Sequence, residues 1–323
     1  MQKADQPSLF FEQERILSLD QPREAGTSIT WSYSRRDRLE QCPLWYYFHY
    51  YGGKTDTAKT EPRKERLRFL RKLSNRYLRV GDITHIAARS YLNALQRGEQ
   101  WELNRVLNWA RGIFRHDIEY SQNFNVADGN CGEVDFPPAL LMELYFAIDG
   151  AEQLLAEAEE RLVNALTNFV GSSEVRPFLA GGRRTSAIVE KPVNLKDGMI
   201  RVKGKIDLAY LDNGRVHVVD WKIGSASGGD SSLQLLSYAI ACMNEFSCQA
   251  EDIDLFRVEL IDKVITPSVV TEGEILRAKM RIVQDLQKME ILDIYGRNAV
   301  AGAFTPCGQK RICSLCPYQE FCP

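Results

Sequence analysis

The fold of this chain is decided by residues 203–222, which read KGKIDLAYLDNGRVHVVDWK. Asn213-Gly214 divides this stretch, and the dipeptide is typical of a two-residue type I′ hairpin turn, because both positions need a positive φ. Such a turn pairs the two residues that flank it, so every later pair has residue numbers that sum to 427. The register therefore predicts that Asp207 lies directly opposite Asp220 on the neighbouring strand.

Directly opposed side chains share one face of a sheet, with Cβ atoms about 4.5–5.5 Å apart. Asp207 and Asp220 would therefore repel each other unless a cation lies between them. Hard divalent cations such as Mg²⁺ and Mn²⁺ take oxygen ligands. Lys222 points to the same face and could orient a water and stabilise charge on a phosphate. The alternative is a solvated hairpin with ordinary surface charges. The same register places Lys205 opposite Lys222, which favours a nearby anion.

The chain has 323 residues, enough for about two domains. Lys plus Arg number 41 against 43 Asp plus Glu, a net charge of −2, so nucleic acid could be bound only by a local basic patch. No run of about 18 apolar residues occurs, which excludes a membrane span. Without a secretory hydrophobic segment at the N-terminus, we expect a cytoplasmic protein whose eight cysteines remain reduced.

The character of the chain changes near residue 180. Residues 54–79 carry ten Lys or Arg and three Asp or Glu, which predicts a basic amphipathic helix. Other helices are expected at about 32–51 (with Ser34 as N-cap), 81–97, 101–122, 137–170, 233–245 and 272–291. Strands are expected at 185–191, 200–210, 215–223 and 254–261. We therefore divide the chain into a mainly helical region at 1–180, a mixed α/β core at 181–300 and a cysteine-rich segment at 301–323.

Three short motifs follow one another in a fixed order, Gly204-x-x-Asp207, Asp220-x-Lys222 and Gln234-x-x-x-Tyr238. Together they resemble the PD-(D/E)XK nucleases of the RecB type, which include the RecB and AddB nuclease domains and the CRISPR-associated RecB-like nucleases. The resemblance extends over about residues 81–323, and the combination is more specific than any single motif. It implies an α/β fold, a restriction-endonuclease-like mixed β-sheet core flanked by helices.

The resemblance also implies roles for individual residues. Asp220 and Asp207 fill the two acidic positions, and Lys222 is the lysine that follows the first of them. His85, in Gly81-x-x-x-His85, matches the helix histidine that supplies a third ligand to Mg²⁺ or Mn²⁺. A single histidine near a helix start is otherwise more often structural. Glu190, on the preceding strand, resembles a glutamate of the family and ranks lower.

Gln234 and Tyr238 are four residues apart on a predicted helix and therefore lie on one face. In the family this pair faces the active site and contacts DNA. The alternative is a capping glutamine and a core tyrosine.

Three cysteines are closely spaced near the C-terminus, as Cys313-x-x-Cys316-x5-Cys322. They are one thiolate short of a four-cysteine cluster site. The iron–sulfur branch of the RecB-like nucleases takes its remaining cysteine from an aromatic N-terminal segment, which implies a [4Fe–4S] cluster on these three residues and Cys42. The alternative is a local zinc site completed by Cys307. The six aromatic residues in 45–51 could stack on unpaired bases or pack around the cluster and the helical core.

These observations predict a metal-dependent DNA nuclease, an exonuclease on single-stranded DNA or DNA ends, in repair or in CRISPR or other defence. No helicase motif is present, so an ATP-driven helicase or a defence protein would be a separate partner chain. The alternative is a non-cleaving DNA-binding or scaffold subunit with the same fold.

Overall fold

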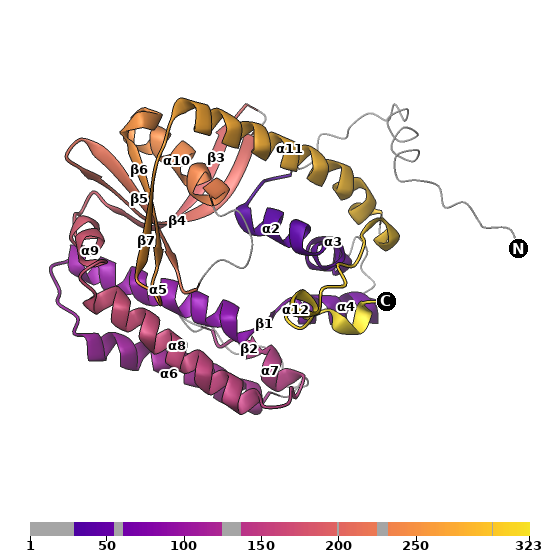
Figure 1. Ribbon diagram of the computed structural model, residues 1–323. Helices are drawn as coiled ribbons and strands as arrows, with labels where there is room; N and C mark the ends of the chain where they lie inside the picture. The colour runs from indigo at the N-terminus through magenta and orange to yellow at the C-terminus, as the bar shows by residue number, and fades with distance from the viewer. Residues whose placement is uncertain (1–28, 55–60, 125–136, 199, 225–231, 299) are drawn as a thin grey trace, which may run out of the picture.

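The computed structural model describes residues 29–54, 61–124, 137–198, 200–224, 232–298 and 300–323. Its centre is a five-stranded sheet in the order β3-β4-β5-β6-β7 (Figure 1). The strands are β3 (Ile188–Asp197), β4 (Ile200–Asp212), β5 (Arg215–Lys222), β6 (Ile253–Glu259) and β7 (Val264–Val269). β5 and β6 are parallel and the other neighbours antiparallel, so the chain crosses over through a helix between β5 and β6.

Helices cover both faces of the sheet (Figure 1). One face packs against α5 (Arg76–Gln96), α8 (Ala151–Gly171) and α9 (Arg176–Gly182), with α6 (Leu103–Gln122) behind them. The other face packs against α10 (Ser232–Phe246) and α11 (Glu272–Arg297). The remaining elements are α2 (Tyr33–Gln41), α3 (Pro43–Tyr47), η1 (Phe48–Gly52), α4 (Pro62–Leu70), β1 (Leu73–Ser74), β2 (Leu140–Leu141), α7 (Met142–Tyr145), η3 (Ala250–Asp252), η4 (Ala301–Ala303), α12 (Lys310–Cys313) and η5 (Gln319–Phe321).

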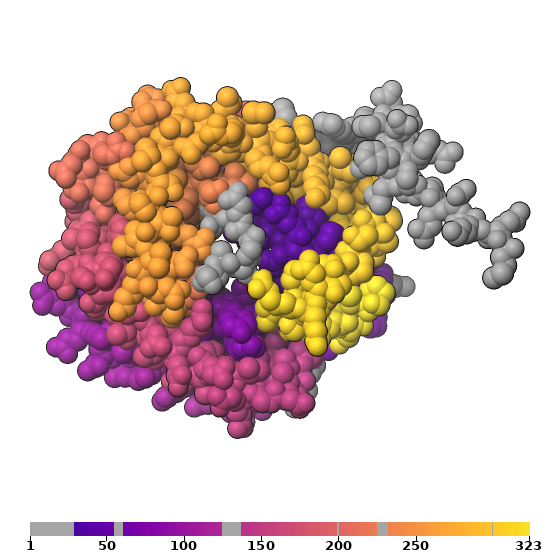
Figure 2. All heavy atoms as spheres, viewed as in Figure 1, coloured from indigo at the N-terminus to yellow at the C-terminus, as the bar shows by residue number. Residues whose placement is uncertain are grey.

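The N-terminal and C-terminal described segments lie side by side. In Figure 2 the yellow C-terminal segment covers part of the indigo segment that holds α2, α3 and η1. The backbone N–H of Leu44 donates to the carbonyl of Thr305 at 3.2 Å. Residues far apart in the sequence therefore form one compact corner of the molecule beside the sheet.

The expected mixed sheet flanked by helices is confirmed, with local corrections. The expected helix at 32–51 begins at the N-cap Ser32 rather than Ser34, and it is interrupted at Cys42, whose φ is −159°. The cause is Pro43, because a proline disfavours helical backbone in the residue before it. The expected helix at 137–170 is broken before Gly150, whose φ is +73° and which precedes α8. The short α9 was not predicted.

Two other expectations also need correction. Of the expected basic helix at 54–79, residues 55–60 lie outside the described residues, and the rest is divided among α4, β1 and the start of α5. The edge strand β7 was not predicted, because Pro267 weakens its strand pattern; proline is tolerated on edge strands.

The predicted hairpin turn is present, with φ of +49° at Asn213 and +80° at Gly214. The predicted register is confirmed over five pairs, from Asp212 opposite Arg215 to Leu208 opposite Val219. The β4–β5 ladder ends there, one position short of the two aspartates. Further along, the backbone of Trp31 takes over beside β4, where it donates to the carbonyl of Arg201 at 2.7 Å and accepts from the N–H of Lys203 at 2.8 Å.

Candidate active site

Asp207 lies where β4 separates from β5. Its Oδ2 accepts a hydrogen bond from the backbone N–H of Trp221 at 2.9 Å, so the side chain replaces a partner in the ladder. The alternation of faces along β4 also reverses here, because Ile206 belongs to the apolar core on the α10 side and Leu208 to the core on the α5 side. This local irregularity places the buried carboxylate of Asp207 at the opening where the two strands separate.

Glu190 on β3 faces the same opening. It lies between the pairs Val189–Leu208 and Lys191–Ile206, at the level of Asp207, and its φ is +49°. A left-handed backbone is unfavourable for a residue with a side chain, and such strain gathers at functional sites. The buried carboxylate of Glu190 is 6% exposed and forms an ion pair with Lys205.

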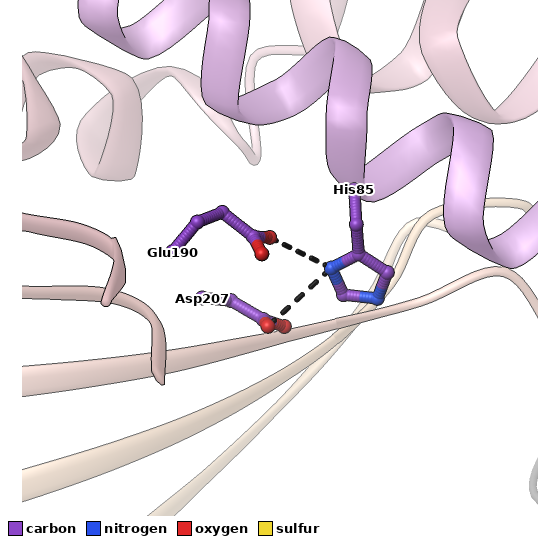
Figure 3. A group of neighbouring side chains, drawn as sticks. All are labelled: His85, Glu190 and Asp207. Atoms are coloured by element: carbon purple, nitrogen blue, oxygen red, sulfur yellow. Dashed lines mark hydrogen bonds and ion pairs between the residues drawn. The ribbon is translucent and has the colours of Figure 1, made fainter. Parts of the chain in front are cut away.

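His85 on α5 completes a cluster with these two acids (Figure 3). Its Nδ1 lies 2.9 Å from Oε1 of Glu190 and 3.3 Å from Oδ1 of Asp207. One ligand atom from each of the three residues lies within 4.8 Å of the others, so the group could hold a metal ion. The side chains come from α5, β3 and β4, three elements that are distant in the sequence.

The two carboxylates of the cluster change the pKa of His85. Burial alone would lower the pKa of His85, but the negative charges of Asp207 and Glu190 and their hydrogen bonds outweigh burial and raise that pKa to about 10. Without a cation the two carboxylates favour the protonated imidazole, whereas a cation that takes up their charge favours the neutral imidazole, the form that binds a metal. The opening has the electrostatics of a cation site.

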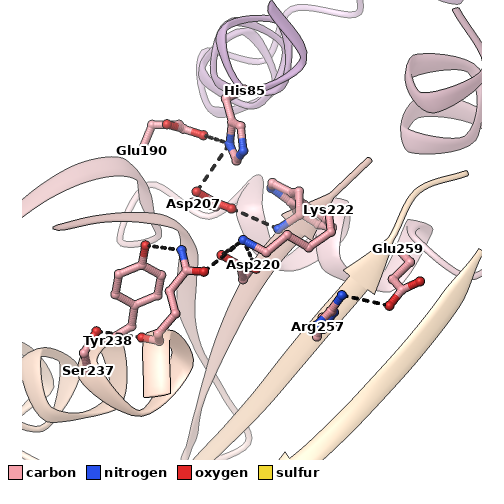
Figure 4. Close-up of polar contacts among 11 residues, drawn as sticks. His85, Glu190, Asp207, Asp220, Lys222, Ser237, Tyr238, Arg257 and Glu259 are labelled. Carbon is pink, nitrogen blue, oxygen red and sulfur yellow. Dashed lines mark hydrogen bonds and ion pairs between the residues drawn. The ribbon is translucent and has the colours of Figure 1, made fainter. Parts of the chain in front are cut away.

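Asp220 and Lys222 lie on β5 at the other side of the opening (Figure 4). The Lys222 ammonium is 2.8 Å from Oδ2 of Asp220 and donates to Oε1 of Gln234 at 2.9 Å. Gln234 in turn donates from Nε2 to the hydroxyl of Tyr238 at 2.8 Å. This chain of contacts fixes the position of the lysine against the sheet.

Asp220 is 1% exposed, and burial raises the pKa of its carboxyl group. The charge of Lys222 lowers that pKa, and the nearby charge of Asp207 raises it. Asp220 is therefore a buried acid whose ionised form needs a cation beside it.

The structure brings the sequence-predicted residues near one another, but the group of possible metal ligands differs from the predicted one. His85 and Asp207 form this ligand group with Glu190, the lower-ranked residue, and not with the predicted ligand Asp220, which instead forms an ion pair with Lys222. The expected repulsion between Lys205 and Lys222 does not arise, because each lysine has its own carboxylate partner. The sequence held little signal for Glu190, since its role depends on the β3–β4 register.

Gln234 and Tyr238 also have the expected geometry. Gln234 and Tyr238 share one face of α10 and reach the opening through Lys222. A Cβ atom at Gly204 would lie 3.0 Å from Cε1 of Tyr238, so the glycine leaves room for this ring. The close packing of the Tyr238 ring therefore explains why a glycine occupies position 204.

Comparison with known proteins identifies the family. The family model of the PD-(D/E)XK nuclease superfamily matches residues 30–323. The chain belongs to the PD-(D/E)XK nuclease superfamily. PD-(D/E)XK nucleases use divalent metals, and the donor set of His85, Glu190 and Asp207, two carboxylates with one imidazole, is suited to Mg²⁺ or Mn²⁺.

Other comparisons add little. No curated protein sequence matches the chain. A solved structure described as "Crystal structure of SSO0001" is 15% identical and covers 75% of this chain and 96% of its own, with a TM-score of 0.29. A likeness at that TM-score carries no argument. Within the described ranges, no helix is long and apolar enough to cross a membrane.

A second feature of this PD-(D/E)XK protein is a cavity of about 280 Å³ between the N-terminal and C-terminal segments. Five cysteines line it, which are Cys42, Cys307, Cys313, Cys316 and Cys322. All five are free thiols. Trp45 and Tyr318 also line this cavity, and the buried Nε1 of Trp45 and hydroxyl of Tyr318 have no hydrogen-bond partner among the described residues.

The aromatic stretch beside Cys42 serves mainly as packing. Five of its six aromatic residues are buried, and Tyr50 is the half-buried exception. Tyr47 and Phe48 contact Phe304 and Tyr318 of the C-terminal segment at ring-centroid distances of 4.9 and 5.5 Å. These contacts favour the interpretation that the stretch packs around the cysteine cavity and its core.

Proposed function

We propose that this chain is a metal-dependent deoxyribonuclease that acts as an exonuclease on single-stranded DNA or DNA ends. The observation that carries the proposal is the opening between β4 and β5, where buried acids meet one histidine and one fixed lysine. A purely structural protein gains nothing from this arrangement, because buried like charges are costly unless a cation neutralises them.

His85, Asp207 and Asp220 are the proposed metal ligands, and Glu190 is placed to join or replace Asp220. A bound Mg²⁺ or Mn²⁺ would activate water and neutralise charge on the phosphodiester. The ammonium of Lys222 holds a positive charge at the edge of the site, where it stabilises a phosphate oxygen. Gln234 keeps Lys222 in position, and Tyr238 keeps Gln234 in position.

The cysteine cavity supports a [4Fe–4S] cluster on Cys42, Cys313, Cys316 and Cys322. A tetrahedral zinc site with Zn–S bonds of about 2.3 Å would need sulfurs about 3.8 Å apart. Among the described residues, no three cysteine sulfurs lie within 4.8 Å of one another. Only a pair, Cys307 and Cys313, has sulfurs as close as 4.0 Å among the described residues, and the lack of a close group of three favours a larger inorganic group. The unpaired N–H of Trp45 and O–H of Tyr318 are suitable hydrogen-bond donors to its sulfurs.

Such a cluster would act as a staple. It would join the segment that carries Cys42 to the C-terminal segment and constrain a long loop of the unfolded chain. Cys307 is the competing fourth ligand, since its Sγ is 4.0 Å from that of Cys313. Elemental analysis of anaerobically purified protein separates the two possibilities, because a cluster gives iron, sulfide and a brown colour, whereas the alternative gives one zinc.

The decisive experiment digests DNA labelled at the 5′ or the 3′ end, with Mn²⁺ or with EDTA. The wild type should shorten single-stranded DNA only with the metal, and the end that loses its label first gives the polarity. Asp220→Ala and Lys222→Ala should each abolish cleavage and remain folded. Cleavage by Asp220→Ala at the wild-type rate would show that the active-site assignment is wrong.

The same experiment tests the other class of function. A non-cleaving DNA-binding or scaffold subunit would retain DNA with Mn²⁺ and leave it intact. Repeating the digestion with proteins encoded by neighbouring genes tests whether a helicase or a defence protein is the partner and places the enzyme in repair or in CRISPR or other defence.

A further inference from the structure

A second cavity, of about 340 Å³, lies away from both the metal cluster and the cysteines. It is formed where α2 and η1 meet β4 and the C-terminal end of α11. Its main polar lining consists of Arg35, Tyr50, Lys54, Lys203, Asp293 and Arg297. Four separate parts of the chain contribute these side chains.

The lining is strongly cationic, with four basic side chains and one carboxylate. Asp293 forms an ion pair with Arg297, which neutralises one of the four. Arg35 donates instead to neutral groups, the hydroxyls of Tyr46 at 3.0 Å and Tyr51 at 3.1 Å. Among the residues that the structure describes, Arg35, Lys54 and Lys203 form no ion pair with a carboxylate.

The cationic groups are held in place by aromatic rings. The guanidinium of Arg35 lies 4.6 Å from the ring centroid of Tyr50, and the ammonium of Lys54 lies 5.0 Å from that of Tyr51. These contacts order the side chains and leave their charge uncompensated. A fixed, uncompensated positive cavity is suited to an anion.

The cavity connects with the active site along β4. Arg201, Lys203 and Lys205 are exposed and occupy alternate positions, so they lie on one face of the strand. Lys203 is four residues from Asp207, a distance of about 13 Å along the strand. Lys203 and Lys205 therefore lead from the cavity to the opening, where Lys205 forms its ion pair with Glu190.

We propose that this cavity holds one backbone phosphate of a single-stranded DNA substrate, a few nucleotides from the bond that is cut. The proposal rests on the proposed nuclease function and assigns its strand-positioning site. Lysine and arginine side chains bind phosphate. The volume admits one nucleotide unit and not a duplex.

The test measures binding without cleavage. Fluorescence anisotropy with labelled oligonucleotides in EDTA gives the dissociation constant at several salt concentrations. The double variant Lys54→Gln/Lys203→Gln should bind single-stranded DNA about tenfold more weakly, equally for different sequences, and the slope of log K against log salt should fall by about 1. Lys203→Gln alone should give part of this loss and guards against misfolding of the double variant.

Lys288→Gln is the matched control. Lys288 is an exposed lysine on α11, nine residues from Arg297 and therefore about half a turn away from the cavity side of the helix. It loses the same single charge as Lys203→Gln and should keep the wild-type slope. An equal fall for this variant would mean that only net charge matters, which would overturn the proposal.

The outcomes separate this proposal from the nuclease proposal. Wild-type slope and affinity in the double variant, or a larger loss on duplex than on single strands, would overturn the cavity assignment while Mn²⁺-dependent cleavage stands. A wild type that does not cleave, together with a reduced slope in the double variant, would overturn only the nuclease activity. In an active enzyme the double variant should raise KM and leave kcat unchanged, because the contact lies outside the reacting atoms.

Discussion

The helix that carries His85 is joined to its neighbour by a buried ion pair. Oδ2 and Oδ1 of Asp117 on α6 accept from Nε and Nη2 of Arg79 on α5 at 2.6 and 2.9 Å. Oδ1 also accepts from the backbone N–H of Ala139 at 2.8 Å. Asp117 is fully buried and Arg79 is 8% exposed. We predict that Asp117→Ala strongly destabilises the protein.

The size of the effect follows from these contacts. The substitution leaves a buried guanidinium without its charge partner, which costs about 3–5 kcal/mol. We take about 4 kcal/mol for the whole change. At about 2.1 cal/mol/K per residue, 323 residues give an unfolding entropy of about 0.7 kcal/mol/K, so Tm should fall by about 6 °C.

The assay is thermal unfolding of the metal-free protein, followed by circular dichroism. Asp149→Ala removes an exposed aspartate and is the control, with an expected change within about 0.5 kcal/mol. The double variant Arg79→Met/Asp117→Leu should recover most of the loss, because an apolar pair has no unpaired charge. A Tm for Asp117→Ala within 2 °C of the wild-type Tm, which is about a third of the expected shift, would refute the reasoning.

Three further predictions concern the two sites and the pH dependence. Asp220→Asn should abolish Mn²⁺-dependent cleavage of end-labelled DNA without lowering the Tm of the metal-free protein, since it removes a buried acid whose pKa burial already raises. Cys42→Ala should lose the brown colour and stability but keep Mn²⁺ binding in calorimetry; a wild-type colour here and its loss in Cys307→Ala would reassign the fourth ligand. Burial, together with the charges of two nearby arginines, lowers the pKa of His49 to about 3. As the pH falls below about 6.5, this histidine therefore takes up a proton in the unfolded chain but not in the folded protein, and the folded protein loses stability. His49→Gln should therefore reduce the loss of stability between pH 7.5 and pH 5.5 by about 1 kcal/mol in urea titrations, and an unchanged loss would contradict the assignment.

The sequence alone determined the features that depend on neighbouring residues. Asn213-Gly214 fixed the turn and the register of β4 against β5, because only a type I′ turn suits that dipeptide between two strands. The spacing of Gln234 and Tyr238 placed both on one face of a helix. Turn geometry and helix periodicity depend only on residues close in the sequence, so they can be predicted without knowing which distant segments pack against them.

The tertiary structure decided the features that depend on packing between distant segments. Glu190 enters the site through the β3–β4 register and a left-handed backbone that no short pattern reveals. Cys42 joins the four cysteines of the C-terminal segment only because that segment folds against α3. The cationic cavity combines side chains from α2, η1, β4 and α11, which are up to 262 residues apart from Arg35 to Arg297. Such positions are set by how the helices bury their apolar faces on the sheet, and this information is spread over the whole chain rather than held in any one motif.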